Sequence, residues 1–127
     1  MGEAQPHLAE TKGTVINISS VAARGMMPGV AVYASSKAAV DHSTRLLAAE
    51  LGSMGIRVNA VAPGLTDTDI TTDVKSNADM LGMIIAQTPM GRLGTPNDIA
   101  NAVLLLADDK AGWVTGQSVQ AGGGFLL

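Results

Sequence analysis

Two short apolar segments stand out along the chain and predict buried strands. Residues 14–19, TVINIS, are rich in β-branched side chains, and residues 56–64, IRVNAVAPG, repeat the pattern before a Pro-Gly stop. Continuous apolar runs of this length are typical of strands covered on both faces, as in a parallel sheet flanked by helices. A third strand is expected within residues 113–121, WVTGQSVQA, after a turn.

Helical periodicity occupies the segments between these strands. Residues 32–52 carry a stripe that becomes apolar towards its C-terminal end, made of Tyr33, Lys37, Val40, Thr44, Leu47 and Leu51. A second helix is predicted to begin at Thr95 as N-cap, with Pro96 at the first helical position and Asp98 at the third, and to run to about residue 107. Strand, helix and strand in succession predict an α/β fold.

Two further segments do not fit the alternation of strands and helices as clearly. Residues 65–95 combine a polar, turn-prone stretch, a plausible helix in DVKSNADMLGMIIAQ and a loop-like TPMGRLG. A long excursion of this kind after a strand often forms a lid over a site. Residues 3–11 could be the end of a helix, with Lys12 and Gly13 as its stop signal.

Composition narrows the class of protein. The 127 residues, 46% of them hydrophobic, fit one compact domain with a core. A net charge of -3 and the lack of clustered Lys and Arg argue against a nucleic-acid partner. There is no cysteine, no signal-peptide pattern and no apolar run long enough for a membrane span. We therefore expect a cytoplasmic protein, without membrane contact, that binds small molecules or other proteins.

One short stretch brings together a hydroxyl, a phenol and an ammonium group. Ser20 follows the first apolar run, and Tyr33, the only tyrosine, precedes Lys37 by four residues. Four residues make about one helical turn, so both side chains share a face, and the lysine charge favours the phenolate form of a nearby tyrosine. Such a set suits proton transfer at a carbonyl or an alcohol. From the spacing alone, a tyrosine and a lysine on a solvated helix end are an equally good interpretation.

Two other kinds of site fit the sequence less well. A serine hydrolase using Ser20, His42 and Asp41 would lack the Gly-x-Ser-x-Gly elbow, and the adjacent Asp41 and His42 project about 100° apart on a helix. The three aspartates within residues 67–73 lack the glycine and the final glutamate of a calcium loop. We therefore expect no metal site.

Taken together, these segments resemble the C-terminal half of the short-chain dehydrogenase/reductase family. GTVINISS followed by YASSK is similar to the family's strand-end serine and Tyr-x-x-x-Lys, with Ser20 thirteen residues before Tyr33. VNAVAPGLTDT is similar to its Asn-x-x-x-Pro-Gly turn, and PMGRLGTPNDIANAVLLLA and WVTGQSVQAGGG resemble its last helix and strand. The resemblance covers residues 6–124. It implies the C-terminal part of a Rossmann-type doubly wound parallel sheet, with about three parallel strands and flanking helices.

The resemblance also implies roles for individual residues. Tyr33 would be the general acid/base, Lys37 would favour its phenolate and bond the nicotinamide ribose, and Ser20 would hold the substrate oxygen. The cofactor would be NAD or NADP, and the substrate a small molecule with a carbonyl/alcohol pair. The other positions expected near the cofactor, through main chain or hydroxyl, are Pro63, Gly64, Leu65, Thr66 and Thr68.

The sequence departs from the family pattern in one important respect. A full member carries a Gly-rich phosphate loop after its first strand, and residues 122–124, GGG, are no substitute because they open no helix. We therefore expect residues 1–127 to form a partial Rossmann-type domain, its catalytic and substrate half. The leading function is an NAD(P)-dependent oxidoreductase of this family, and the alternative is a truncated, non-catalytic remnant acting only in subunit association. An open edge on the strand at residues 14–19 would favour a homo-oligomer.

Overall fold

A sheet of three parallel strands forms the centre of the computed structural model, which describes residues 2–127. The strands are β1 (Thr14–Ile18), β2 (Arg57–Pro63) and β3 (Ser118–Ala121), and they lie side by side in that order. β2 pairs in parallel with β1 on one side and with β3 on the other. The expectation of three parallel strands is therefore confirmed.

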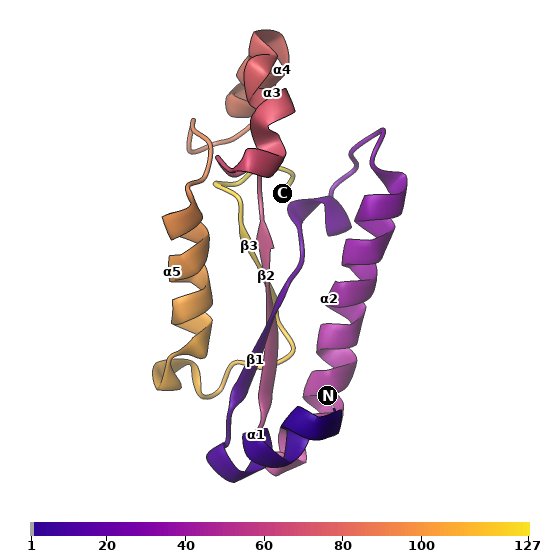
Figure 1. Ribbon diagram of the computed structural model, residues 1–127, viewed down its shortest axis with the longest axis vertical. Coiled ribbons are helices and arrows are strands. Elements are labelled where there is room, and N and C mark those ends of the chain that lie inside the picture. The colour runs from indigo at the N-terminus through magenta and orange to yellow at the C-terminus, as the bar shows by residue number, and fades with distance from the viewer. Residues whose placement is uncertain (1) are drawn as a thin grey trace.

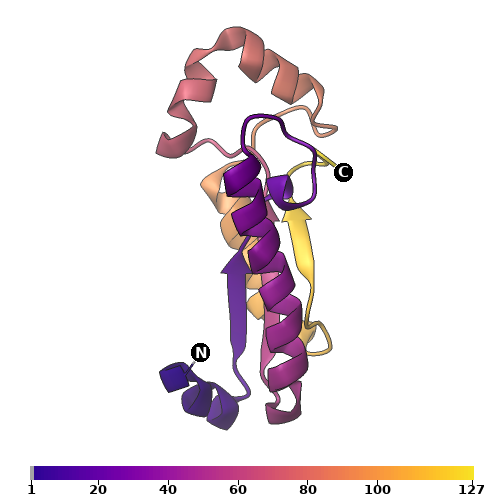
Figure 2. The ribbon, with the colours of Figure 1, turned by 90° about the vertical axis from the view of Figure 1, so that its right-hand side faces the viewer.

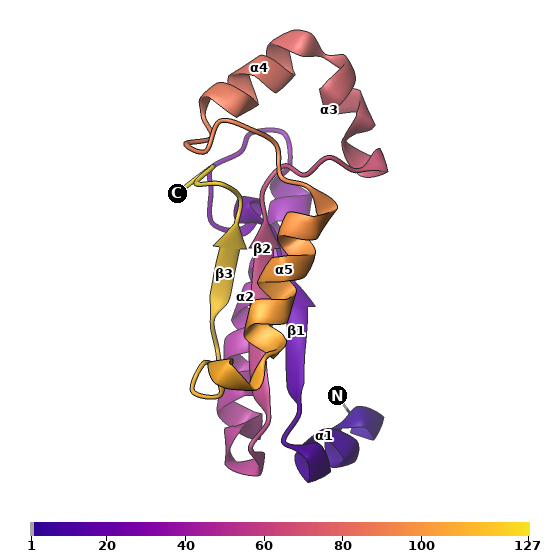
Figure 3. The same ribbon diagram turned by 90° about the vertical axis from the view of Figure 1, so that its left-hand side faces the viewer.

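Helices cover both faces of this sheet. The long helix α2 (Ala31–Leu51) lies against one face and α5 (Pro96–Ala107) against the other (Figures 1 and 3). α1 (Gln5–Thr11) lies near the start of β1, whereas α3 (Thr72–Ser76) and α4 (Ala78–Ala86) stand beyond the carboxyl ends of the strands (Figure 2). The short 3-10 helices are η1 (Gly2–Ala4), η2 (Val21–Ala23), η3 (Gly52–Met54), η4 (Asp69–Thr71) and η5 (Asp109–Ala111).

The two predicted core strands differ in burial. Residues 58–62 of β2 are all buried, because β2 has a strand on each side and a helix on each face. β1 is only half-buried, and Ile18 at its end is 46% exposed. Within residues 2–127, β1 pairs with β2 alone, so its outer edge is open. The expectation of a strand buried on both faces is correct for β2 and wrong for β1.

The last strand is shorter than the sequence suggested. Ladder pairing begins only at Ser118, and Trp113 is fully exposed on the preceding turn. Before Ser118, a side chain adds to the main-chain bonds that hold this segment to β2: the buried Asn59 donates from Nδ2 to the Val114 carbonyl (2.9 Å) and accepts from the Gln117 N–H (3.0 Å). Asn59 thus bonds backbone groups of the turn that leads into β3 and satisfies its own buried amide.

The inward face of α2 combines an apolar end with a polar middle. Leu51 joins the buried cluster of Ile56 and Val58, as the apolar stripe predicted, and Ala48, which lay outside that stripe, joins it too. Two to three turns earlier, the buried Asp41 accepts a hydrogen bond from the Ser118 hydroxyl (2.7 Å). No local pattern in the sequence indicated a buried carboxylate at this position.

Residues 65–95 do leave the sheet as a long excursion. They carry η4, α3 and α4 over the carboxyl ends of the strands and then return to their starting point (Figure 2). The return is closed by main-chain bonds from Gly94 N to Leu65 O (3.0 Å) and from Asp67 N to Gly94 O (2.8 Å). The segment has the position of a lid. Among residues 2–127, no helix has the length and hydropathy needed to cross a membrane.

The start of α5 is fixed by a reciprocal capping box. Thr95 Oγ1 accepts from the Asp98 N–H (3.2 Å), and Asp98 Oδ2 accepts from the Thr95 N–H (2.7 Å). Hydrogen bonding to Arg92, then to Thr95, holds the pKa of Asp98 well below its usual range. Because the folded-state pKa is lowered, the stability from this carboxylate is present above about pH 4 and is lost as pH falls towards the folded pKa.

Replacing the cap should destabilise the protein measurably. Thr95→Ala removes the acceptor of the Asp98 N–H and is expected to lower the free energy of unfolding by about 1 kcal/mol. Urea denaturation at neutral pH measures the change. The exposed Asn97→Ala in the same turn is the control and should be nearly neutral. Equal losses in both variants would contradict the capping role.

Candidate active site

A cavity of about 560 Å³ opens at the carboxyl ends of the parallel strands. Open α/β sheets bind ligands at this edge, because loops from neighbouring strands meet there. The walls come from the end of β1, the first turns of α2, the turn after β2, the lid and the C-terminal segment. The lining includes every residue proposed from the sequence: Ser20, Tyr33, Lys37, Pro63, Gly64, Leu65, Thr66 and Thr68.

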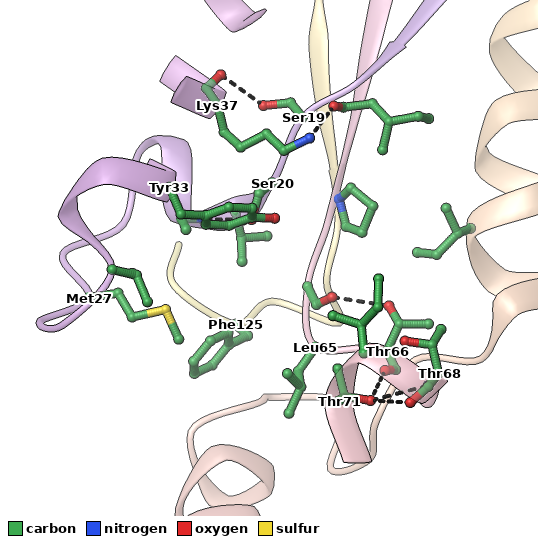
Figure 4. A pocket seen from close by; sticks show the side chains of 18 of the residues that line it. Ser19, Ser20, Met27, Tyr33, Lys37, Leu65, Thr66, Thr68, Thr71 and Phe125 are labelled. Atoms are coloured by element: carbon green, nitrogen blue, oxygen red, sulfur yellow. Dashed lines mark hydrogen bonds between the residues drawn. The ribbon is translucent and has the colours of Figure 1, made fainter. Parts of the chain in front are cut away.

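The two serines after β1 have different hydrogen-bonding partners. The buried Ser20 is the N-cap of η2, where its oxygen accepts from the Ala22 N–H (3.1 Å). A hydroxyl that accepts in this way still has its proton to donate. The neighbouring Ser19 donates to the Lys37 carbonyl (3.3 Å) and so ties the end of β1 to α2 (Figure 4). Ser20 is the serine whose hydroxyl proton stays available to a ligand.

Tyr33 and Lys37 lie one turn apart at the beginning of α2, and β1 fixes the lysine. The Lys37 ammonium donates to the Ile18 carbonyl at the end of β1 (2.9 Å). It lies 5.9 Å from the centre of the Tyr33 ring, which is half-exposed towards the cavity (Figure 4). An ammonium has three N–H donors, so two remain after this bond. The arrangement puts a positive charge and spare donors beside the phenol.

The Pro63-Gly64 turn is a place where two backbone segments meet closely. A Cβ on Gly64 would lie 2.6 Å from the Gly122 Cα, well inside contact distance. The sequence left this turn open between a simple strand stop and a cofactor-binding turn. The structure shows that a glycine is required at position 64 for steric reasons alone, because the end of β2 there touches the backbone of the segment after β3.

Threonine hydroxyls stabilise the loop that follows this turn. Thr66 donates to the Gly64 carbonyl (3.0 Å), and Thr71 donates to the Thr66 carbonyl (2.7 Å). Thr71 also accepts from the Thr68 N–H (3.1 Å). The sequence analysis missed Thr71, which lines the cavity beside Thr68. The sequence did contain an indication of this role, because Thr71 follows Thr68 by three residues, the spacing of a helix capping pair.

The sequence analysis also missed the apolar wall of the cavity. Val21, Ile84 and Phe125 form a buried cluster, and Met27 and Leu65 pack against it. These residues come from parts of the chain that are distant in sequence, including the connection between β1 and α2, α4 and the C-terminal segment. No local pattern could assemble them, because only the tertiary fold brings these segments together.

The residues of the alternative sites do not come together as those sites would require. Asp41 accepts from Ser118 and lies 3.3 Å from the Arg24 guanidinium, whereas the exposed His42 ring lies 3.4 Å from the Arg45 guanidinium. The Asp–His–Ser geometry of a hydrolase is therefore not formed. Asp67 pairs with Lys75. Across the described part of the chain, no three His, Cys, Asp or Glu side chains are grouped as metal ligands.

Comparison with known proteins identifies the family. The family described as enoyl-(acyl carrier protein) reductase matches residues 1–126. The chain belongs to the short-chain dehydrogenase/reductase family. An uncharacterised oxidoreductase of Methylorubrum extorquens is 46% identical over 122 residues, which are 95% of this chain and 49% of that protein. A 3-oxoacyl-[acyl-carrier-protein] reductase of Rickettsia felis is 43% identical over 115 residues, 91% of this chain and 47% of that protein.

Solved structures of this family share the fold. A 4-hydroxyisoleucine dehydrogenase in complex with NADH superposes with a TM-score of 0.90 at 33% sequence identity. The match covers 97% of this chain and 51% of that dehydrogenase. The chain thus has the fold of part of a short-chain dehydrogenase/reductase, and it spans about half the length of the curated relatives it matches.

Proposed function

We propose that residues 2–127 form the catalytic and substrate-binding half of a Rossmann-type domain, in an NAD(P)-dependent oxidoreductase that interconverts a carbonyl and an alcohol. The observation that carries the proposal is the convergence of Ser20, Tyr33 and Lys37 on one cavity at the carboxyl edge of the sheet. A proton donor, an oxygen-binding hydroxyl and a fixed positive charge are the groups that carbonyl reduction needs.

Each of the three side chains has one task in the proposed reaction. Tyr33 gives its phenolic proton to the substrate oxygen during reduction and takes it back during oxidation. Ser20 donates its free hydroxyl proton to the same oxygen and so fixes the position of the carbonyl. Lys37, held by the Ile18 carbonyl, stabilises the phenolate that forms on Tyr33. When bound, a reduced nicotinamide supplies the hydride that the carbonyl carbon gains.

The residues around the cavity fit the nicotinamide end of such a cofactor. A volume of about 560 Å³ lies in the range of small-molecule sites, and Lys37 has spare N–H donors for ribose hydroxyls. Pro63, Gly64, Leu65, Thr66 and Thr68 line the same cavity, and we propose that their main chain and the Thr68 hydroxyl bind this end. Residues 2–127 contain no glycine-rich turn between a strand and a helix, so the proposal assigns them no phosphate contacts.

Titration with reduced cofactors tests the proposal directly. Nicotinamide fluorescence should change on addition of the purified chain to NADH, to NADPH and to reduced nicotinamide mononucleotide, which lacks the adenylate half. We expect weak binding, on the order of millimolar, and little difference among the three, because the described residues hold only the nicotinamide end. Binding by none of them would contradict the proposal.

A pair of lysine variants makes the titration specific to the site. Lys37→Met removes the ammonium beside Tyr33 and should weaken binding about tenfold, the loss expected for one charge-assisted hydrogen bond. Lys110→Met makes the same change on the exposed η5 and is the matched control, with unchanged binding expected. If both variants bind alike, the bound molecule does not contact Lys37.

The proposal includes association between copies of the chain. In the chain by itself, the outer edge of β1 is open within the described residues, and Val32 and Leu46 project from α2 with large exposed areas. Open strand edges and exposed apolar side chains both favour protein–protein contact. These features support a homo-oligomer.

A further inference from the structure

One side of the cavity is apolar and uncharged. Val21, Ile84 and Phe125 are buried there, and Met27 and Leu65 pack against them. Met27, Leu65 and Phe125 are labelled in Figure 4. Among the residues of the described chain that line the cavity, Lys37 alone carries a charge at neutral pH. Its ammonium lies at the end of β1, beside Tyr33, and not in the apolar cluster. A carboxylate or phosphate on the body of a substrate would find no partner on that side.

Of the six hydroxyl-bearing residues that line the cavity, three already donate to the main chain. Ser19 donates to the Lys37 carbonyl, Thr66 to the Gly64 carbonyl and Thr71 to the Thr66 carbonyl. Within residues 2–127, the hydroxyls of Ser20, Tyr33 and Thr68 donate to no acceptor. Each hydroxyl has only one proton, so the capacity to bind substrate oxygens is small and lies mainly at Ser20 and Tyr33.

The apolar wall is held in place by contacts between the lid and the C-terminal segment. Gly123 and Gly124 have φ of 61° and 89°, values that favour glycine, and they turn the chain back after β3. The Gly123 carbonyl accepts from the Met90 N–H (3.1 Å) at the end of the lid. The turn brings Phe125 against Ile84 of α4. The wall is therefore a feature of the folded site and not a loose surface patch.

We propose that the site takes an uncharged substrate whose reacting carbonyl or alcohol is attached to an apolar body of several carbons. The inference rests on the proposed function and names its substrate class. One oxygen is held at Ser20 and Tyr33, and the apolar body lies on Val21, Met27, Ile84 and Phe125. Polyhydroxylated and charged carbonyl compounds are disfavoured, because their polar groups would lose water without gaining partners in the cavity.

A series of carbonyl compounds tests the substrate class without requiring turnover. Acetone, 2-pentanone and 2-octanone share one carbonyl and differ in apolar length, whereas dihydroxyacetone and pyruvate add hydroxyls or a charge. Ligand-detected saturation-transfer NMR on the wild-type chain should show affinity rising about fourfold for each methylene until the wall is covered. Dihydroxyacetone and pyruvate should bind more weakly than 2-pentanone.

Methionine methyl groups give the position of the bound ketone. With ¹³C-methyl methionine, 2-octanone should shift the resonance of Met27, which lines the cavity, and leave that of Met54 in η3 unchanged. A matched pair of variants then tests the wall. Met27→Gln should reduce the affinity for 2-octanone about tenfold and leave that for acetone nearly unchanged, whereas Met26→Gln, at a position 92% exposed, should alter neither.

The outcomes separate this inference from the proposed function. Pyruvate or dihydroxyacetone binding as tightly as 2-octanone, or an affinity independent of chain length, would overturn the substrate class. Length-dependent binding without any reduction by NADH or NADPH, once the chain is joined to a cofactor-binding half, would keep the apolar site and remove the proposed function. Reduction of ketones without any preference for longer ones would support the proposed function and overturn the substrate class.

Discussion

Tyr33→Phe is expected to lower kcat/KM for carbonyl reduction by about 10²–10⁴-fold, the usual contribution of a positioned general acid. The change corresponds to about 3–5 kcal/mol of transition-state stabilisation. The variant removes one oxygen from a half-exposed ring and keeps the ring itself, so the fold should be preserved. The assay uses residues 2–127 placed after the N-terminal half of the Methylorubrum relative, of which this chain spans 49%.

Neighbouring serines provide a control within the same site. Ser20→Ala removes the free hydroxyl proton and should also lower kcat/KM, whereas Ser19→Ala removes a bond to the Lys37 carbonyl and should affect stability more than catalysis. Thermal unfolding of each variant measures the stability change separately. Full activity in Tyr33→Phe would refute its role as the acid, whatever the serines do.

Gly64→Ala is expected to destabilise the protein by about 2–3 kcal/mol. The added Cβ would meet the Gly122 Cα at 2.6 Å, a contact with main chain that no change of rotamer can relieve. The segment after β3 would have to move, and Phe125 and the apolar wall would move with it. Urea denaturation gives the stability change. The ketone titrations described above should show a weaker dependence on chain length in the same variant.

Gly82→Ala is the matched control for this substitution. Gly82 lies inside α4, and a Cβ built on it meets nothing within 4 Å. Alanine in a helix interior is more favourable than glycine, so this variant should be stabilised by up to about 1 kcal/mol. Unchanged stability in Gly64→Ala would mean that the two backbone segments are not as close in solution as in the structure.

Much of the fold could be predicted from local patterns. The β-branched runs located β1 and β2, and the Thr95-Pro96 start with its Asp98 cap located α5. These predictions succeeded because strand and helix boundaries depend on neighbours in sequence. The prediction for β3 was less accurate, because the turn before it is held by the side chain of Asn59, far away in sequence, which bonds to residues 114 and 117.

The residues of the candidate site also fall into those that local patterns predicted and those that they missed. Tyr33 and Lys37 were recognisable because one helical turn separates them, and Ser20 because it follows a strand. The roles of these residues stay predictions for the variants above to test. The burial and pairing of Asp41, and the place of Thr71 in the site, were overlooked, since a carboxylate paired with Ser118 and Arg24, or a hydroxyl bonded to Thr66, is visible only in three dimensions.

The sequence by itself therefore determined the order and type of the elements, the family resemblance and the polar groups that could move a proton. Only the tertiary structure decided which side chains meet at the carboxyl edge of the sheet, which hydroxyls remain free and where the apolar wall stands. The physical reason is that helix and strand formation follows short-range periodicity. A cavity wall such as that of Val21, Ile84 and Phe125 exists only after segments distant along the chain have packed together.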